Sequence, residues 1–114
     1  MKRLLILSIL FFLYTFMSCT SDSIDDDNIP PNNNVTYSGA IKKIMDENCL
    51  NCHSDPTKNG APMSLNTYQN TKESVENRGL IGRVENGSMP STGSKLTAVQ
   101  IKAIKDWEIG GFAE

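Results

Sequence analysis

Three residues in the middle of the chain, Cys49, Cys52 and His53, have the types and the spacing for one specific chemistry. Two cysteines three positions apart, with a histidine directly after the second, form the attachment signature of c-type haem. Each thiol can add across one vinyl group of the porphyrin, because one tight turn of backbone brings both sulfurs to the same edge of the ring. The imidazole that follows is then placed to bind the iron as its proximal ligand. We therefore expect one haem bonded covalently to Cys49 and Cys52, with His53 on the iron.

Three other interpretations of this motif are a zinc site, a thioredoxin-type redox pair and a structural disulfide. A zinc site needs about four protein ligands, and the chain has one histidine and only one further cysteine, Cys19. A redox pair expects a strand that leads into a helix, and no strand pattern precedes Cys49. A disulfide leaves His53 without a role, so covalent haem accounts for the motif best.

The iron position opposite His53 must be filled or left open, and a second histidine is excluded because none exists. Met45 lies in the expected helix that leads into the haem motif, too close in sequence to reach the far side. Met63 begins a stretch that we expect to pack in the interior. Met89 lies 36 residues after His53 in a loop, with a glycine two residues before it and a proline directly after it. Such a loop can hold a side chain over a flat cofactor, so Met89 is the expected distal ligand, with Met63 and an exposed Met89 as alternatives.

The elements that must position these residues are helical, and no segment alternates with period two for long enough to predict a strand. The last helix has the clearest ends, since Thr97 and Gln100 fit a capping box and Gly110-Gly111 stop the helix. Leu96 and Ile101 can form a hydrophobic staple around that cap. The other expected helices are 37–48, with Ser38 as its cap, 67–77 and 80–85. The positions expected to face the interior are Tyr37, Ile41, Ile44, Met45, Asn48, Tyr68, Val75, Leu80, Ile81, Val84, Ile101, Ile104 and Trp107.

Taken together, these features resemble a small class I c-type cytochrome domain with one haem and His/Met ligation, of the kind that bacterial lipoproteins carry. The resemblance covers Tyr37–Phe112 and rests on the haem motif, on Ser88-Met89-Pro90 and on the capped last helix with Trp107. It implies an all-α, cytochrome c-like bundle of three to five short helices around one covalently bound haem c. In that family the first and last helices cross beside the haem. One departure is the missing aromatic residue on the first helix, where many relatives carry Phe and where Ile41 or Ile44 must serve.

The resemblance implies transfer of single electrons rather than enzymatic turnover, because an iron with both axial positions filled does not readily bind oxygen or peroxide. Two alternatives stay open. One is a haem-containing subunit or module of a larger oxidoreductase, and the other is a haem sensor or peroxidase with an open sixth site. Arg78 and Arg83 are near enough to Met89 in sequence to pair with a haem propionate, although solvated helix charges are the plainer interpretation.

The beginning of the chain resembles the leader of a bacterial lipoprotein. Lys2 and Arg3 precede an apolar run of thirteen residues, Leu4–Phe16, which has the length of a signal-peptide core and is shorter than the roughly 20 residues of a membrane span. Ser18-Cys19 resembles a lipobox, with Phe16 where leucine is usual, so we expect Cys19 to be the lipidated first residue of the mature protein. A membrane anchor helix is the alternative. The expected division is a signal peptide over 1–18, a tether over 19–35 and a cytochrome domain over 36–114.

Charge and composition limit the classes of partner that the protein can bind. The chain of 114 residues has room for one domain, with 39% hydrophobic residues and a formal charge of −2. Without the leader, nine basic residues face 13 acidic ones, which argues against nucleic acid and slightly favours redox proteins with basic faces. The acidic run Asp25–Asp27 after Cys19 resembles the sorting tag of some surface lipoproteins, or is an ordinary hydrophilic spacer. We expect an exported protein, lipid-anchored to a bacterial membrane on its periplasmic or cell-surface side.

Overall fold

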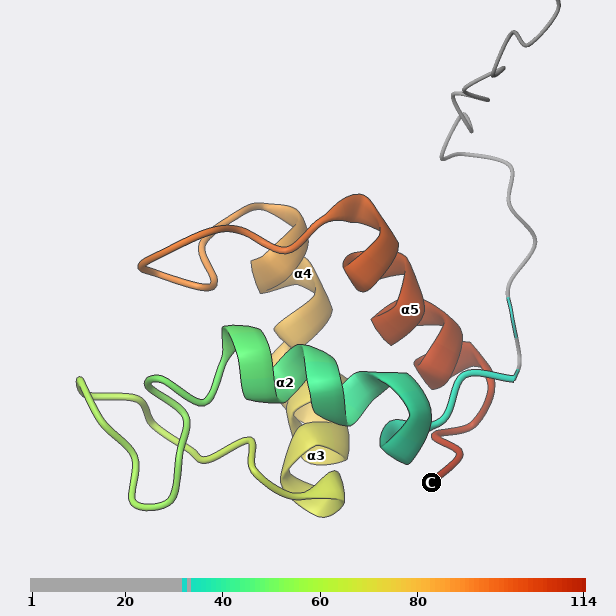
Figure 1. Cartoon of the computed structure of the whole chain (residues 1–114), viewed down its shortest axis with the longest axis horizontal. Helices are drawn as coiled ribbons and strands as arrows, with labels where there is room; N and C mark the ends of the chain where they lie inside the picture. The colour runs from blue at the N-terminus through green and yellow to red at the C-terminus, as the bar shows by residue number, and fades with distance from the viewer. Residues whose placement is uncertain (1–31, 33) are drawn as a thin grey trace, which may run out of the picture.

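The computed structural model describes residue 32 and residues 34–114, and within them the chain forms helices and loops without a strand (Figure 1). The elements in chain order are the π-helical turn η1 (Tyr37–Ile41), α2 (Lys42–Asn48), α3 (Tyr68–Arg78), α4 (Leu80–Glu85) and α5 (Ala98–Ile109). The fold class is all-α, as expected. The expected signal peptide and most of the expected tether, including Cys19, lie outside the described residues.

The first predicted helix begins with a wide turn and then continues as α2. Thr36 caps it, not Ser38, because Thr36 has extended backbone and its hydroxyl oxygen accepts the Gly39 N–H at 3.0 Å. The prediction of Ser38 as the cap was wrong, since Ser38 already lies within the first turn. A Cβ at Gly39 would come within 2.7 Å of the Thr36 hydroxyl oxygen, so glycine at this position permits the cap.

The later helices follow the predicted boundaries closely. Thr67 caps α3, and the chain passes from α3 to α4 through Gly79, whose φ of 67° lies in the left-handed region that glycine adopts without strain. At α5 the capping box is present, since the Thr97 hydroxyl oxygen accepts the Gln100 N–H at 3.2 Å and Gln100 Oε1 accepts the Thr97 N–H at 2.9 Å. These caps determine at which residues α3 and α5 begin, and so which of their side chains face the interior.

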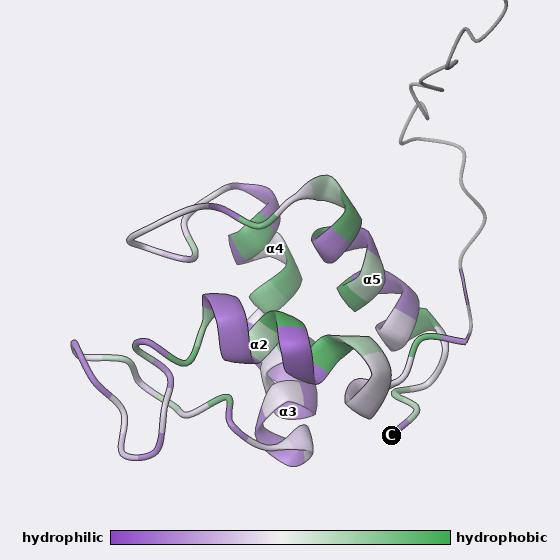
Figure 2. Cartoon of the chain, viewed as in Figure 1, coloured by the Kyte–Doolittle hydropathy of each residue, from purple (hydrophilic) through white to green (hydrophobic). Residues whose placement is uncertain are grey.

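One apolar core joins the elements. The turn η1 packs against α5, and α4 packs against both α3 and α5, so the first and last helical segments lie side by side (Figure 1). The buried apolar side chains come from every element and from the two long loops, and they are Tyr37, Ile41, Ile44, Met45, Leu65, Val75, Leu80, Val84, Leu96, Ile104 and Trp107. Asn48, Tyr68, Ile81 and Ile101, which were also expected inside, are partly buried. Figure 2 shows the loops away from this core mostly in purple, which marks hydrophilic residues, and in near-white, which marks intermediate hydropathy.

Trp107 is the centre of an aromatic cluster at one end of the domain. Its ring lies 5.9 Å from the rings of Tyr37 and Tyr68 and 4.9 Å from that of Phe112, between centroids. The Trp107 indole N–H donates to the Ala113 carbonyl at 2.7 Å, and the Tyr68 hydroxyl donates to the Phe112 carbonyl at 2.8 Å. The C-terminal residues are thereby folded back over the helix crossing.

Candidate functional site

The two cysteines and the histidine of the haem motif follow directly from the end of α2. The Cys49 N–H donates to the Met45 carbonyl at 2.8 Å, and the N–H groups of Cys52 and His53 both donate to the Cys49 carbonyl, at 3.1 and 2.9 Å. This extra turn brings all three side chains to the wall of one cavity. Both thiols are free and half-buried, and burial raises the pKa of the Cys49 thiol to about 11. The two thiols, three positions apart in the sequence, therefore line the same cavity, as addition to one porphyrin requires.

The His53 ring is oriented by a backbone acceptor on the following loop. Its Nδ1 donates to the Met63 carbonyl at 2.7 Å, and the Leu65 N–H donates to the His53 carbonyl at 2.7 Å. With Nδ1 committed in this way, Nε2 is the nitrogen left for a metal, and the hydrogen bond makes the imidazole a more basic ligand. The sequence gives no side-chain signal for this contact, because the acceptor is a main-chain oxygen.

Met89 is held at the cavity by the loop between α4 and α5. Its N–H donates to the Arg83 carbonyl at 3.0 Å, and the Ser88 hydroxyl donates to the same oxygen at 3.2 Å. The Lys95 ammonium group donates to the Pro90 carbonyl and so links the two arms of the loop. The structure therefore brings Met89 to the same cavity as His53 and the two cysteines.

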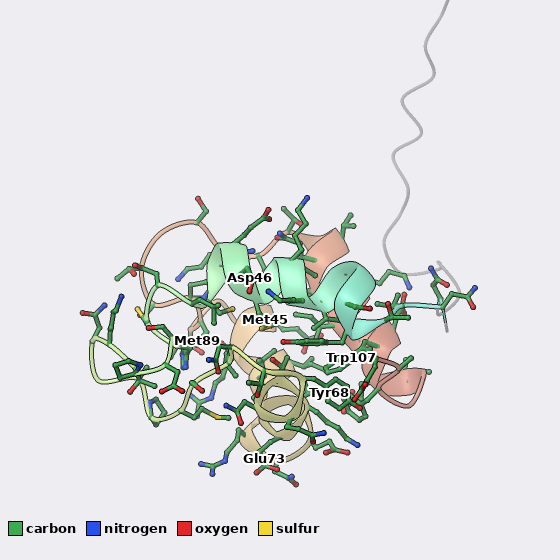
Figure 3. All side chains as sticks on the ribbon, turned by 60° about the horizontal axis from the view of Figure 1, so that its bottom comes forward. Met45, Asp46, Tyr68, Glu73, Met89 and Trp107 are labelled. Atoms are coloured by element: carbon green, nitrogen blue, oxygen red, sulfur yellow. The ribbon has the colours of Figure 1, made fainter. Side chains whose placement is uncertain are left out.

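The two other candidate methionines differ in position. Met45 is 1% exposed in the core and does not line the cavity, which agrees with its exclusion as a ligand. Met63 does line the cavity, but its carbonyl is already fixed against His53 Nδ1. In Figure 3, Met89 lies on one side of Met45, whereas Tyr68 and Trp107 lie on the other. The predicted ligand loop and the aromatic cluster thus occupy different parts of the domain.

The cavity has a volume of about 310 Å³, within the range of small-molecule sites. Its apolar wall comes from Pro62, Leu65, Leu80 and Val84. The polar residues that line it and that the sequence did not indicate are Asn51, Asn59, Ser74, Ser91 and Thr92, whereas Asn48, which also lines it, was expected to face the interior. Hydrophobic periodicity cannot single out such residues, since it reports which face of a helix is buried and not what lies against that face.

The donor set of the cavity fits a covalently attached iron porphyrin. Two thiols, an imidazole with one free nitrogen and a thioether share an enclosure with apolar walls. A zinc site lacks support, because the described residues contain no group of three or more His, Cys, Asp or Glu that could hold a metal ion. Arg78 and Arg83 also line the cavity, although both are exposed.

The helical, strand-free fold around such a cavity is that of a small c-type cytochrome domain. The model of the family described as cytochrome c oxidase, cbb3-type, subunit III, matches residues 39–107, more than half of the chain, and the chain belongs to that family. No curated protein and no solved structure matches the chain. The domain is a haem c electron-transfer module, with the role of an electron carrier or of an oxidase subunit. Within the part of the chain that the structure describes, no helix is both long enough and apolar enough to cross a bilayer.

Proposed function

We propose that the chain is a monohaem c-type cytochrome that passes single electrons at a bacterial membrane surface, facing the periplasm or the outside. Cys49 and Cys52 would form the two thioether bonds, and His53 and Met89 would bind the iron. Haem c, when bound, supplies an iron that alternates between the ferrous and ferric states. The observation that carries the proposal is the meeting of both thiols, the His53 ring with its committed Nδ1, and Met89 at one cavity.

The residues of the chain control how the electron is held. The Met63 carbonyl keeps the His53 ring in one orientation, so its free nitrogen stays directed at one position. The Met89 thioether would be the second iron ligand from the chain; it would favour the reduced state over the oxidised one and keep oxygen and peroxide from the metal. The apolar side chains of Leu65, Leu80 and Val84 exclude water from the cavity wall. Small reorganisation on electron transfer follows from this fixed, dry surrounding.

The proposal is tested on full-length protein matured in a bacterial periplasm. We expect a pyridine haemochrome spectrum of a haem with two thioether bonds, and an intact mass that contains one haem. The reduced native protein should not bind carbon monoxide rapidly, because Met89 occupies the sixth position. A colourless mature protein would contradict the proposed function, and rapid carbon monoxide binding would favour a sensor or peroxidase instead.

The proposed location depends on Cys19. The positively charged start, the apolar run and Ser18-Cys19 support cleavage before Cys19 and lipidation of its thiol and amino group. A matched pair of proteins, wild type and Cys19→Ala, separates this anchor from the haem chemistry. We expect wild type in the membrane fraction with an acylated N-terminus, and Cys19→Ala without the acyl mass.

A second candidate function is a haem module docked on a larger oxidoreductase. The observation that favours it is the family description, which names a subunit of an oxidase. Co-purification from detergent-solubilised membranes of the native host distinguishes the two candidates. A stable complex with a membrane oxidoreductase indicates the subunit, whereas release as a single chain indicates the carrier. Redox proteins are the partners in both cases, and nucleic acid is not among them.

A further inference from the structure

Two positive charges border one corner of the cavity. Arg78 is the last residue of α3 and Arg83 lies in α4, and both line the cavity. Among the described residues, no Asp or Glu lines it. The two helices are joined by Gly79 alone, which has a left-handed backbone, and the Arg83 side chain reaches back to the main chain of Arg78.

These charges are poorly neutralised by the protein. Arg83 forms no ion pair with any residue that the structure describes, and its Nε donates to the Arg78 carbonyl at 3.5 Å. Arg78 has one acidic neighbour, Glu73, with Nε and Oε1 3.7 Å apart. Those two side chains are 60% and 46% exposed, so water screens their attraction and the pair contributes little. A corner with two guanidinium groups and one weakly held carboxylate favours an anionic ligand.

We propose that Arg78 and Arg83 bind the two propionate carboxylates of the haem and thereby raise its reduction potential. The inference rests on the proposed attachment of haem at Cys49 and Cys52. Guanidinium groups bind carboxylates through two parallel N–H donors. Positive charge near the iron also disfavours the ferric state, which carries one more positive charge than the ferrous state.

The backbone and the side chain of Arg83 have separable roles. Its carbonyl accepts the Met89 N–H at 3.0 Å and the Ser88 hydroxyl at 3.2 Å. A substitution of the side chain leaves this carbonyl in place. Variants at position 83 therefore remove the guanidinium while the loop that carries Met89 keeps its backbone contact.

The experiment compares reduction potentials of haem-loaded, full-length variants over a range of pH. The variants are Arg78→Gln, Arg83→Gln, the double variant and Arg83→Lys, with Lys43→Gln as the matched control. Lys43 lies on α2, outside the cavity, and its ammonium is 3.9 Å from Glu47 Oε1 at the surface. Each Arg→Gln change should lower the reduction equilibrium constant by about two- to fivefold, as expected for partly exposed ion pairs. Arg83→Lys keeps the charge and should keep most of the native value.

The pH profile distinguishes carboxylate binding from a general structural effect. When its cation is removed, a propionate holds its proton to a higher pH, because the neighbouring charge no longer favours the ionised form. The reduced state binds that proton more tightly than the ferric state does. The potential of the Gln variants should therefore fall as pH rises through the carboxylate range, where the wild-type profile is flatter.

Two results would overturn the inference. One is a native potential and pH profile in both Arg78→Gln and Arg83→Gln, with changes no larger than those of Lys43→Gln. The other is an Arg83→Lys protein as low in potential as Arg83→Gln. Neither result bears on haem attachment, which the haemochrome spectrum and the intact mass of wild type report separately, so failure of the proposed function is recognisable by itself.

Discussion

At one end of the domain, Trp107 is fully buried among Tyr37, Tyr68 and Phe112, and hydrogen bonds to the C-terminal residues close the cluster. At the other end, two loops border a cavity, and main-chain acceptors fix their ligand residues, as at His53 and Met89. The aromatic end is complete with protein side chains alone. The cavity end gathers two thiols, an imidazole, a thioether and two guanidinium groups, which the proposed haem would use. We therefore expect substitutions at the aromatic end to change mainly the stability of the domain. Substitutions at the cavity end should change mainly haem attachment and iron ligation.

The largest effect is expected from Cys49→Ala with Cys52→Ala. Without either thiol no thioether bond can form, so covalent haem should be lost completely from the periplasmic product. The pyridine haemochrome assay and the intact mass measure this loss. Cys19→Ala serves as the control and should retain the full haem content. Covalently bound haem in the double variant would contradict the assignment of the cavity end.

Trp107→Ala should cause the next largest effect, a loss of about 3–5 kcal/mol in the free energy of unfolding, since removal of the fully buried indole leaves a cavity and removes one of the two hydrogen bonds to the Ala113 carbonyl. Denaturant unfolding of the haem-loaded protein measures it. Val99 lies on the same helix and is 76% exposed, so Val99→Ala should change the free energy of unfolding by less than about 0.5 kcal/mol. Equal losses of unfolding free energy in Trp107→Ala and Val99→Ala would contradict the stabilising role of the aromatic end.

Met89→Ala should alter the cavity end and leave the aromatic end intact. With the thioether gone, the reduced protein should bind carbon monoxide rapidly, and the reduction equilibrium constant should fall by about tenfold or more because thioether ligation favours ferrous iron. Met63→Ala is the matched control, since Met63 lines the same cavity. A change in the iron spectrum with Met63→Ala and none with Met89→Ala would exchange their roles.

Thr97→Ala is expected to have the smallest measurable effect, a loss of about 1 kcal/mol in unfolding free energy, because the Gln100 N–H loses its acceptor. Thermal unfolding detects the change, and the exposed loop substitution Thr57→Ala is the control. The visible spectrum should be native in both variants. A shift of the iron ligation with Thr97→Ala would show that α5 capping is coupled to the cavity.

The parts predictable from the sequence are those with a local signal. The boundaries of α4 and the capping box of α5 were confirmed because glycine, threonine and glutamine at fixed offsets specify them. The meeting of Cys49, Cys52, His53 and Met89 at one cavity also agrees with expectation, since three of these residues are neighbours in the chain. The functional roles of these residues stay predictions.

The parts that could not be predicted depend on long-range or main-chain contacts. The prediction of Ser38 as the cap was wrong because the helical backbone already begins at Tyr37, so the cap falls on Thr36, two residues before Ser38. A 3.6-residue pattern does not report the wide turn η1. The Met63 carbonyl acceptor of His53 is invisible in sequence, since every residue has a carbonyl. The sequence alone does not distinguish propionate binding from plain solvation for Arg78 and Arg83. Only the structure, in which Gly79 joins α3 to α4, shows that both residues line the cavity.

The Ala113 carbonyl accepts two hydrogen bonds, from the Trp107 indole and from the Tyr37 N–H at 2.8 Å. The first helical turn and the C-terminal residues therefore lie side by side (Figure 1), and neither Tyr37 nor Ala113 lines the cavity. A unit with adjacent entry and exit can be inserted between other protein segments, or joined in tandem, without strain on the redox centre. The geometry of the domain therefore suits an electron-transfer module that is fused to other proteins.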